Sequence, residues 1–517
     1  MRVVALPVDA RPAVRTQVVA LAATGGVDLV VPPVEALGHF RKPADRDALA
    51  AWLMHEATRA DGLVISLDML VYGGLVPSRF IEDDGASLIA RFEVLRTLRR
   101  QYPKLPIYAF AATMRISNNN VAEEEKPYWA QYGETIWQWS WHCDRAHVLP
   151  SAENEQAARN AEARVPAEIR DDYLATRARN FAVTLAALAL VEAGVIDRLV
   201  LPQDDTAEWG FNISERRQLE AEVNRRGLSD RVLIYPGADE VMHTLCAHLV
   251  ARQRGDAPLR VALRLADPQG IVALRARYED RPIVDSIAAQ FAAAGAETVA
   301  GDDALPPDVV VGVWTRGSAQ GDWAMRIGLD DARSDVEVLS DSQSWFASLL
   351  RESASGVAVA VVDLAYANGG DPVLLEGLQR HGLLSQLVAY AGWNTASNSL
   401  GNLAAQLVLA RRDYAAPSNR ALRALRLLED YLYQAVWRQH VRDQLHAETG
   451  GVGAFDESLT TPEARLRCVE SLFMPAANAW LEAQELPYRV SAVSLPWQRT
   501  FEIDIALAAS SEAEGAA

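Results

Sequence analysis

Short apolar runs that each stop at polar residues constrain this chain more than any other feature of its sequence. Leu199, Val200 and Leu201 form one such run, which follows a long helical pattern and ends at Pro202. Helical patterns separate most of the similar runs. The eight expected strands begin at Val3, Asp28, Leu63, Ile107, Leu199, Val232, Val357 and Leu387. Strands that alternate with helices predict an α/β fold with parallel sheets.

Eight such strands predict a modified (β/α)8 barrel of the TIM type. Its first part would span residues 1–258 with a helical insertion at 121–194, and its end would span 351–415. A small α/β unit would be inserted at 259–350, and a helical C-terminal region with a disordered tail would span 416–517. The same pattern also fits two doubly wound α/β domains that meet at a cleft. A chain of 517 residues is long enough for either architecture.

The composition excludes several classes of partner. A net charge of −18 argues against nucleic acid and anionic membrane surfaces, which attract clustered Lys and Arg, and favours a neutral or cationic small substrate. Cys143, Cys246 and Cys468 are odd in number and far apart, so they indicate neither a disulfide framework nor a thiolate metal site. The first apolar run is too short for a signal peptide, and no stretch approaches the roughly 20 apolar residues of a membrane span. We therefore expect a cytoplasmic protein, whose oligomeric state the sequence leaves open.

Asp204 and Asp205 carry the most specific chemistry in the sequence. They follow the strand at Leu199 directly, and α/β folds place catalytic groups at the carboxyl ends of strands. If the loop is extended, the two neighbouring side chains diverge and can address different atoms of one substrate. In the alternative interpretation, one Asp caps the following helix and the other is solvated.

Other strand ends also carry polar groups. Because a partly buried carboxylate costs desolvation energy, their concentration at strand ends favours a binding site. Trp393 between Gly392 and Asn394 suits a sugar, since an indole can cover a ring face while amides bond hydroxyls. Two structural alternatives remain: Asp9 and Arg11 can pair with each other, and the carboxylates that precede residue 241 can serve as a helix cap. The expected substrate-binding residues are Asp9, Arg11, Asp68, Tyr72, Arg115, Asn118, Asp239, Glu240, Asp363, Asn368, Trp393, Asn394 and Asn398.

Aromatic residues gather in the expected helical insertion. Trp129, Trp137, Trp139 and Trp141 occur there together with Tyr128 and Tyr132. Their helical spacing favours a role in a local core over a ligand platform.

Four phrases of the sequence resemble the bacterial domain-of-unknown-function family 4127 (DUF4127). They are PVDARP (7–12), SLDMLVYGG (66–74), YANGGD (366–371) and YAGWNT (390–395), and the resemblance spans nearly the whole chain. This family implies no activity. The pair Asp204-Asp205 is locally similar to the Asp-Asp motif of family 84 glycoside hydrolases and to the Asp-Glu pair of other β-N-acetylhexosaminidases.

The leading hypothesis is a glycoside hydrolase of the N-acetylhexosaminidase type. In this mechanism the acetamido oxygen of the substrate attacks the anomeric carbon, so the enzyme needs one carboxylate to polarise the amide N–H and another to protonate the leaving oxygen. The sequence hypothesis gives the first role to Asp204 and the second to Asp205. It requires neither a cofactor nor a metal.

Two other hypotheses stay open. One is a hydrolase or isomerase that uses Mg²⁺ or Mn²⁺ held by Asp9, Asp68, Asp204 or Asp239, because carboxylate-only sets favour these ions over zinc. The other is a carbohydrate-binding protein without catalytic activity.

Overall fold

The computed structural model describes residues 1–300, 305–329, 334–449 and 460–510, which form two compact units. Unit 1 comprises Met1–Ala10, Val27–Leu245 and Tyr278–Asp280, and unit 2 comprises Arg11–Gly26, Cys246–Arg277 and Arg281–Ala517. We expected a disordered tail over residues 510–517, and all of it after Ser510 lies outside the described residues.

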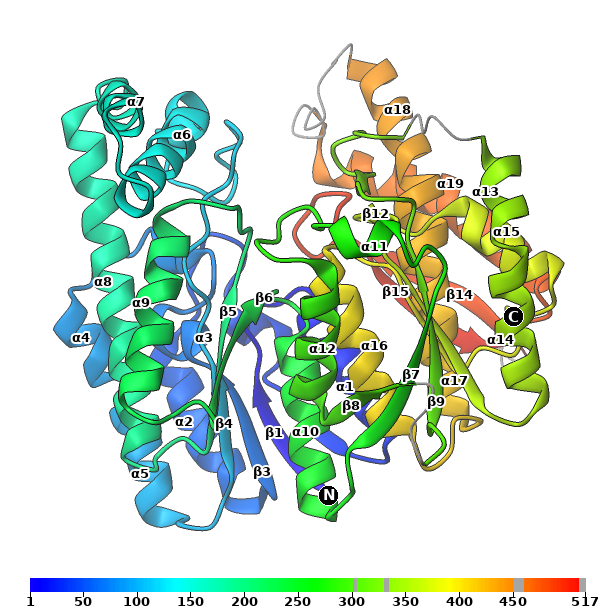
Figure 1. Cartoon of the computed structure of the whole chain (residues 1–517). Helices are drawn as coiled ribbons and strands as arrows, with labels where there is room; N and C mark the ends of the chain where they lie inside the picture. The colour runs from blue at the N-terminus through cyan, green and yellow to red at the C-terminus, as the bar shows by residue number, and fades with distance from the viewer. Residues whose placement is uncertain (301–304, 330–333, 450–459, 511–517) are drawn as a thin grey trace. The chain divides into compact units, whose positions relative to one another are not determined.

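Unit 1 is built on an open sheet of six parallel strands in the order β2-β1-β3-β4-β5-β6 (Figure 1). Alternate residues of these strands, such as Leu63 and Ile65 in β3, pack into one apolar core with helices of the same unit. The other residues of β3 are buried as well, as expected for a parallel sheet covered on both faces. The strands are β1 (Arg2–Leu6), β2 (Asp28–Val30), β3 (Gly62–Ser66), β4 (Ile107–Phe110), β5 (Arg198–Gln203) and β6 (Val232–Pro236).

The expected helical insertion between β4 and β5 consists of three long helices. Trp129 and Trp139 are buried there in a local core with Ile136 and Tyr173, so the interpretation of this aromatic set as core is confirmed for them. The helices of unit 1 are α2 (Arg46–Glu56), α3 (Leu67–Tyr72), α4 (Gly85–Ala90), α5 (Glu93–Gln101), α6 (Trp129–Val148), α7 (Ala152–Glu162), α8 (Ala167–Glu192) and α9 (Phe211–Arg225), and α10 (Val241–Arg254) begins in this unit.

Helix α8 is the one described helix whose length and apolar composition would suffice to cross a membrane. Half of its apolar window is buried inside the protein. Val183, Ala187, Leu188 and Val191 lie in the core of unit 1, so α8 packs there as core helices do.

Unit 2 has its own open sheet of five parallel strands in the order β13-β11-β9-β7-β8. Helices α14 and α15 lie on one side of this sheet and α12 and α16 on the other (Figure 1). The strands are β7 (Leu259–Leu265), β8 (Ala296–Val299), β9 (Val309–Trp314), β11 (Ala358–Asp363) and β13 (Ala389–Ala391), and β10 (Gly321–Asp322) pairs with β12 (Tyr366–Ala367).

The rest of unit 2 is mostly helical and ends in an antiparallel hairpin. Every residue of α16 is buried, and this helix packs against α12, α1, β11 and β13. The helices are α1 (Thr16–Thr24), α11 (Gly270–Ala273), α12 (Ile283–Ala294), α13 (Asp335–Asp341), α14 (Gln343–Ala354), α15 (Pro372–Arg380), α16 (Ala396–Ala410), α17 (Pro417–Arg426), the π-helix η5 (Leu427–Trp437), α18 (Arg438–Thr449) and α19 (Pro462–Ala483), and the hairpin is β14 (Tyr488–Ser494) with β15 (Asp504–Ala509).

The structure corrects the expectation of a closed barrel. All eight expected strands form, but the first six lie in the sheet of unit 1 and the last two lie in the sheet of unit 2. Both described sheets are open, as in the second architecture that we considered. The segment 259–350 contributes β7, β8 and β9 to the same sheet as β11 and β13, so the expected boundary at 350 falls within a sheet. Strand and helix alternation fits both architectures equally, because the order of strands is set by long-range pairing.

Candidate functional site

The carboxyl ends of β3, β4 and β5 bring together several residues that the sequence singled out. The Ser66 hydroxyl accepts a hydrogen bond from the Met69 amide at 3.1 Å and caps α3, which places Asp68 in the first turn of this helix. Arg115 follows β4, and Asp204 and Asp205 follow β5. The strands β3, β4 and β5 are neighbours in the sheet, so these four side chains share one edge.

Arg115 is the centre of an ion-pair network at this edge. Its guanidinium lies 3.2 Å from Asp205 Oδ2, 3.0 Å from Glu124 Oε2 and 3.1 Å from Glu125 Oε1. Burial lowers the pKa of Arg115, but the three carboxylates outweigh burial and hold the pKa well above its usual value. The positive charge of Arg115 is therefore permanent, and it favours the ionised form of Asp205.

Arg79 provides a second, more deeply buried cation. Its side chain is 2% exposed, and Nη1 donates to the carbonyl oxygen of Glu124 at 2.8 Å and to Glu125 Oε1 at 2.9 Å. Its Nη2 lies 3.9 Å from Asp204 Oδ2. Asp204 and Asp205 thus pair with different arginines, and the contact of Asp204 is the longer one.

Neighbouring segments of unit 1 hold the two loops that carry this network. Arg177 binds both carboxylate oxygens of Glu215, at 2.8 and 2.6 Å, and its Nη1 lies 3.5 Å from the carbonyl oxygen of Arg115. The Thr206 amide donates to the Tyr278 carbonyl at 2.8 Å. These contacts fix the backbone at Arg115 and directly after Asp205, as a preorganised site requires.

Three carboxyl groups of the site have perturbed pKa values. Burial raises the pKa of Asp204 to about 6, with a further rise from the charge of Asp205 and an opposing effect of Arg115 and Arg79. Burial also raises the pKa of Asp205, against Arg115. Burial raises the pKa of Asp68 to about 7, although its Oδ2 accepts a hydrogen bond from the Ala112 amide at 2.9 Å. Groups that titrate near neutrality beside permanently charged groups suit acid–base chemistry.

The backbone turns between the two adjacent carboxylates. Asp205 has a φ of 43°, in the left-handed region that residues with a side chain rarely adopt. The side chains of Asp204 and Asp205 remain 16% and 23% exposed, so a ligand can reach both. Neither side chain caps a helix in this structure, because α9 begins only at Phe211 and its N-terminal residue Gly210 donates its amide to Asp144.

The other expected residues of unit 1 lie at strand or helix ends. Asp9 and Asp239 are 6% and 4% exposed, and Tyr72 is buried at the end of α3. Asn118 is exposed in the loop that carries Arg115. The carboxylate of Glu240 accepts the Ala238 amide at 2.9 Å immediately before α10. This bond lies outside the helix, so the helix cap expected at these carboxylates stays a prediction.

Six expected residues belong to unit 2, and five of them form a separate group. Asp363 Oδ2 accepts the Asp371 amide at 2.5 Å and the Tyr390 hydroxyl at 3.2 Å. The Asn368 amide donates to the carbonyl oxygen of Asn394 at 2.8 Å.

Trp393 and Asn398 are each 2% exposed, which leaves the Trp393 indole no open face for a sugar ring. Arg11, also in unit 2, stacks over the Trp497 ring at 4.8 Å.

Sequence reasoning missed Arg79, Glu124 and Glu125. Glu124 and Glu125 belong to an acidic run directly after the expected Asn118 loop, and this run was the available signal. Arg79 lies in η4 (Pro77–Arg79), eleven residues after Asp68, and nothing in its local pattern distinguishes it from a surface arginine.

No group of three or more His, Cys, Asp or Glu side chains within the described ranges has the arrangement of a metal site. In unit 1 the carboxylates face two guanidinium groups, and these positive charges would repel a divalent cation.

Comparison with known proteins identifies the family. A model of DUF4127, described as a protein of unknown function, matches residues 3–506. The chain belongs to the DUF4127 family. No curated protein matches this sequence. The carboxylate and arginine cluster of this DUF4127 protein must therefore be interpreted from its own chemistry.

Proposed function

We propose that this DUF4127 protein is a glycoside hydrolase that acts on 2-acetamido sugars, with Asp204 and Asp205 as catalytic residues. The observation that carries the proposal is the electrostatic difference between two adjacent, reachable carboxyl groups: Asp205 lies 3.2 Å from Arg115, whereas Asp204 has its closest cation at 3.9 Å and a pKa of about 6. Burial raises the pKa of both groups, but the ion pair of Asp205 is the shorter one, so we assign the proton to Asp204 and the ionised form to Asp205.

These contacts favour a different division of roles from the sequence hypothesis. Asp205, paired with Arg115 at 3.2 Å, would in its ionised form accept a hydrogen bond from the acetamido N–H and orient this group. Asp204 would be the general acid. Arg115 is a positioning residue in this scheme, and the charge of Asp204 contributes to the raised pKa of Asp68.

The reaction proceeds in two steps that balance without a cofactor. First, the acetamido oxygen forms a bond to the anomeric carbon while the glycosidic bond breaks, and Asp204 transfers its proton to the departing oxygen. Second, Asp204, now a carboxylate, takes a proton from water as the water oxygen attacks the anomeric carbon and the bond to the acetamido oxygen breaks. The sugar leaves with its anomeric configuration retained.

A panel of 4-nitrophenyl glycosides tests this proposal. We expect hydrolysis of one or more N-acetylhexosaminides and no hydrolysis of the matching hexosides that lack the acetamido group, because the nucleophile is then missing. Asp230→Asn is the matched control for substitution of Asp204 or Asp205, since Asp230 is exposed in the same unit just before β6. Absence of turnover on every N-acetylhexosaminide would overturn the proposal. Equal rates on substrates with and without the acetamido group would show that the acetamido oxygen is not the nucleophile.

A further inference from the structure

Unit 2 contains a polar cavity at the carboxyl ends of two central strands. The cavity measures about 170 Å³ and is lined by Asp267 after β7, Thr315 and Arg316 after β9, Asp341 at the end of α13, and Ser342 between α13 and α14. Pockets for drug-sized ligands measure roughly 300–1,000 Å³, so this cavity suits a smaller molecule, of the size of one sugar ring.

The cavity lies where the topology of the sheet opens a crevice. In the order β13-β11-β9-β7-β8, the chain runs from β7 outward to β8 and then returns to β9 on the other side of β7. The segments that leave β7 and β9 therefore diverge, and open parallel sheets bind ligands at such switch points beyond the carboxyl ends of the strands.

One wall residue has an unmet hydrogen-bonding group. Thr315 is 4% exposed, and its Oγ1 has no hydrogen-bond partner among the described residues. A buried hydroxyl without a partner costs free energy, and because this oxygen is closed to solvent, the Thr315 side chain must rotate toward the cavity to meet a hydroxyl group of a bound ligand. Ser342 is also buried and does not cap α14 with its side chain.

Neighbouring contacts hold the charged walls in place. Asp371 binds Arg316 through Nε at 2.7 Å and Nη2 at 3.0 Å, and it also accepts the Trp314 indole N–H at 2.7 Å. Asp267 Oδ1 accepts the Gly270 amide at 2.9 Å. A Cβ on Gly270 would lie 2.3 Å from Asp267 Oδ2, so this close approach requires glycine.

We infer that this cavity is a binding site for a neutral monosaccharide. Its walls combine carboxylates that accept hydrogen bonds, a guanidinium that donates them, and hydroxyls that do both, which matches the alternating donors and acceptors of a polyol.

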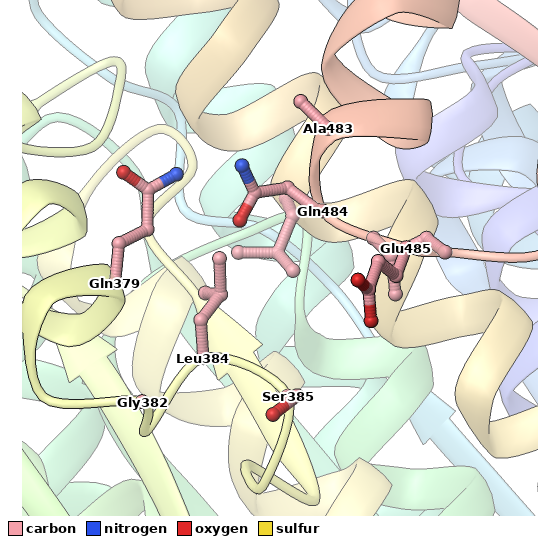
Figure 2. A pocket seen from close by; sticks show the side chains of 9 residues that line it. Gln379, Gly382, Leu384, Ser385, Ala483, Gln484 and Glu485 are labelled. Atoms are coloured by element: carbon pink, nitrogen blue, oxygen red, sulfur yellow. The ribbon is translucent and has the colours of Figure 1, made fainter.

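A second cavity of unit 2 provides a contrast. It measures about 190 Å³, and Figure 2 shows the amides of Gln379 and Gln484 on either side of it above Leu384. Ser385 on its wall precedes β13, so this cavity is at the amino end of that strand, where parallel sheets rarely bind ligands. Ser385→Ala is therefore a matched control for Ser342→Ala.

Calorimetric titration of the full chain with N-acetylglucosamine, glucose, glucosamine and glucuronate tests the inference. The Asp204→Asn/Asp205→Asn double variant serves as background, so that neither turnover nor unit 1 carboxylates enter the result. We expect a neutral sugar to bind, Thr315→Val and Ser342→Ala each to weaken its binding about 3- to 10-fold, and Ser385→Ala to have no effect.

Thermal unfolding of each variant separates lost binding from lost folding, and Ser342→Ala keeps the test valid if Thr315→Val fails to fold. Absence of neutral-sugar binding in the double variant, or binding that neither substitution weakens, would overturn the inference. Tighter binding of glucosamine or glucuronate than of the neutral sugars would overturn the assigned ligand class. The proposed hydrolysis is measured on the unmodified chain, so the two proposals can fail separately.

Discussion

At the scale of single residues, the environment of each carboxyl group determines its chemistry. Asp204 and Asp205 are neighbours in sequence, yet one lies 3.9 Å from a buried arginine and the other 3.2 Å from a partly exposed one. This difference cannot be predicted from the sequence, because both arginines reach the pair from distant segments.

The division of roles predicts different losses in two variants. A nitrophenolate departs without a proton, so Asp204→Asn should retain most of its activity on nitrophenyl substrates and lose about 10²–10⁴-fold on a disaccharide, which needs the acid. Asp205→Asn should be slow on both, because attack by the acetamido group is impaired. Measured kcat/KM values of both variants on both substrate types test this division of roles. If Asp205→Asn retained activity on nitrophenyl substrates and Asp204→Asn did not, the roles expected from the sequence would be correct.

The raised pKa of Asp204 predicts the shape of the pH profile. Because the general acid must be protonated, kcat/KM for the disaccharide should fall as the pH rises through about 6, the pKa of Asp204. The same descending limb should be weak for a nitrophenyl substrate, whose leaving group needs no proton. A disaccharide profile that is flat between pH 5 and pH 8 would exclude Asp204 as the acid.

At the scale of elements, the aromatic insertion supports the loop after β5. Trp139 of α6 packs edge-on against Phe211 at the start of α9, with ring centroids 4.9 Å apart. The Ser140 hydroxyl accepts the Phe211 amide at 2.7 Å. The insertion thus fixes the end of the segment that carries Asp204 and Asp205.

Trp139→Ala should therefore cost about 3–5 kcal/mol of stability, because it opens a cavity in the core of the insertion. Trp141→Ala is the matched control: Trp141 is only partly buried and stacks with Arg145 at 5.1 Å. Chemical denaturation followed by circular dichroism measures both. Equal losses in the two variants would contradict the assignment of Trp139 to a core.

In unit 2, the π-helix η5 supports two loops that follow strands. Its Asp430 carbonyl accepts the Gly370 amide at 2.8 Å, and the Asp430 carboxylate accepts the Gly392 amide at 2.9 Å. Long π-helical segments are rare, since their i→i+5 bonding displaces carbonyl groups from α-helical geometry. Here one residue of η5 holds the loops that follow β12 and β13.

Gly370→Ala should disrupt this junction. A Cβ at Gly370 would lie 2.2 Å from the Tyr390 hydroxyl, which is buried and bonded to Asp363, so we expect a loss of about 1–3 kcal/mol. At Gly85 the nearest atom to an added Cβ is Arg179 Cγ at 3.9 Å, so Gly85→Ala should be neutral. Thermal unfolding compares the two variants, and an unchanged midpoint for Gly370→Ala would mean that the junction relaxes freely.

At the scale of the whole molecule, the sequence predicted the strands better than their assembly. Every expected strand formed, and Asp68, Arg115, Asp204 and Asp205 meet at one edge because parallel strands align their carboxyl ends. The prediction of a closed barrel was wrong, because it made β6 and β11 neighbours, whereas these strands belong to different sheets. Sugar contact by Trp393 is not favoured, because this side chain is only 2% exposed, and its burial could not be predicted from a Gly-Trp-Asn phrase.

Both described sheets follow the same connection scheme. In unit 1 the second strand lies outside the first and the later strands continue on the other side, and β7, β8, β9, β11 and β13 repeat this arrangement in unit 2. Each unit therefore has its own switch point.

Buried carboxyl groups in both units predict how the stability of the whole molecule depends on pH. Burial raises the pKa of Asp68 to about 7 and the pKa values of Asp363 and Glu429 to about 8, from ordinary values near 4. Between pH values of about 4 and about 8, these groups bind more protons in the folded chain than in the unfolded chain. The free energy of unfolding should therefore fall as the pH rises through this range.

The thermal midpoint should therefore be higher at pH 5.5 than at pH 8 in buffers of equal ionic strength. Asp68→Asn keeps an acceptor for the Ala112 amide but cannot ionise, so it should remove up to roughly 4 kcal/mol of this pH dependence. Asp230→Asn should leave the dependence unchanged, because its carboxyl group is exposed. A midpoint that stays level or rises toward pH 8 would mean that these carboxyl groups ionise in the folded protein near their ordinary pKa values, and the acid–base argument for unit 1 would then lose its electrostatic basis.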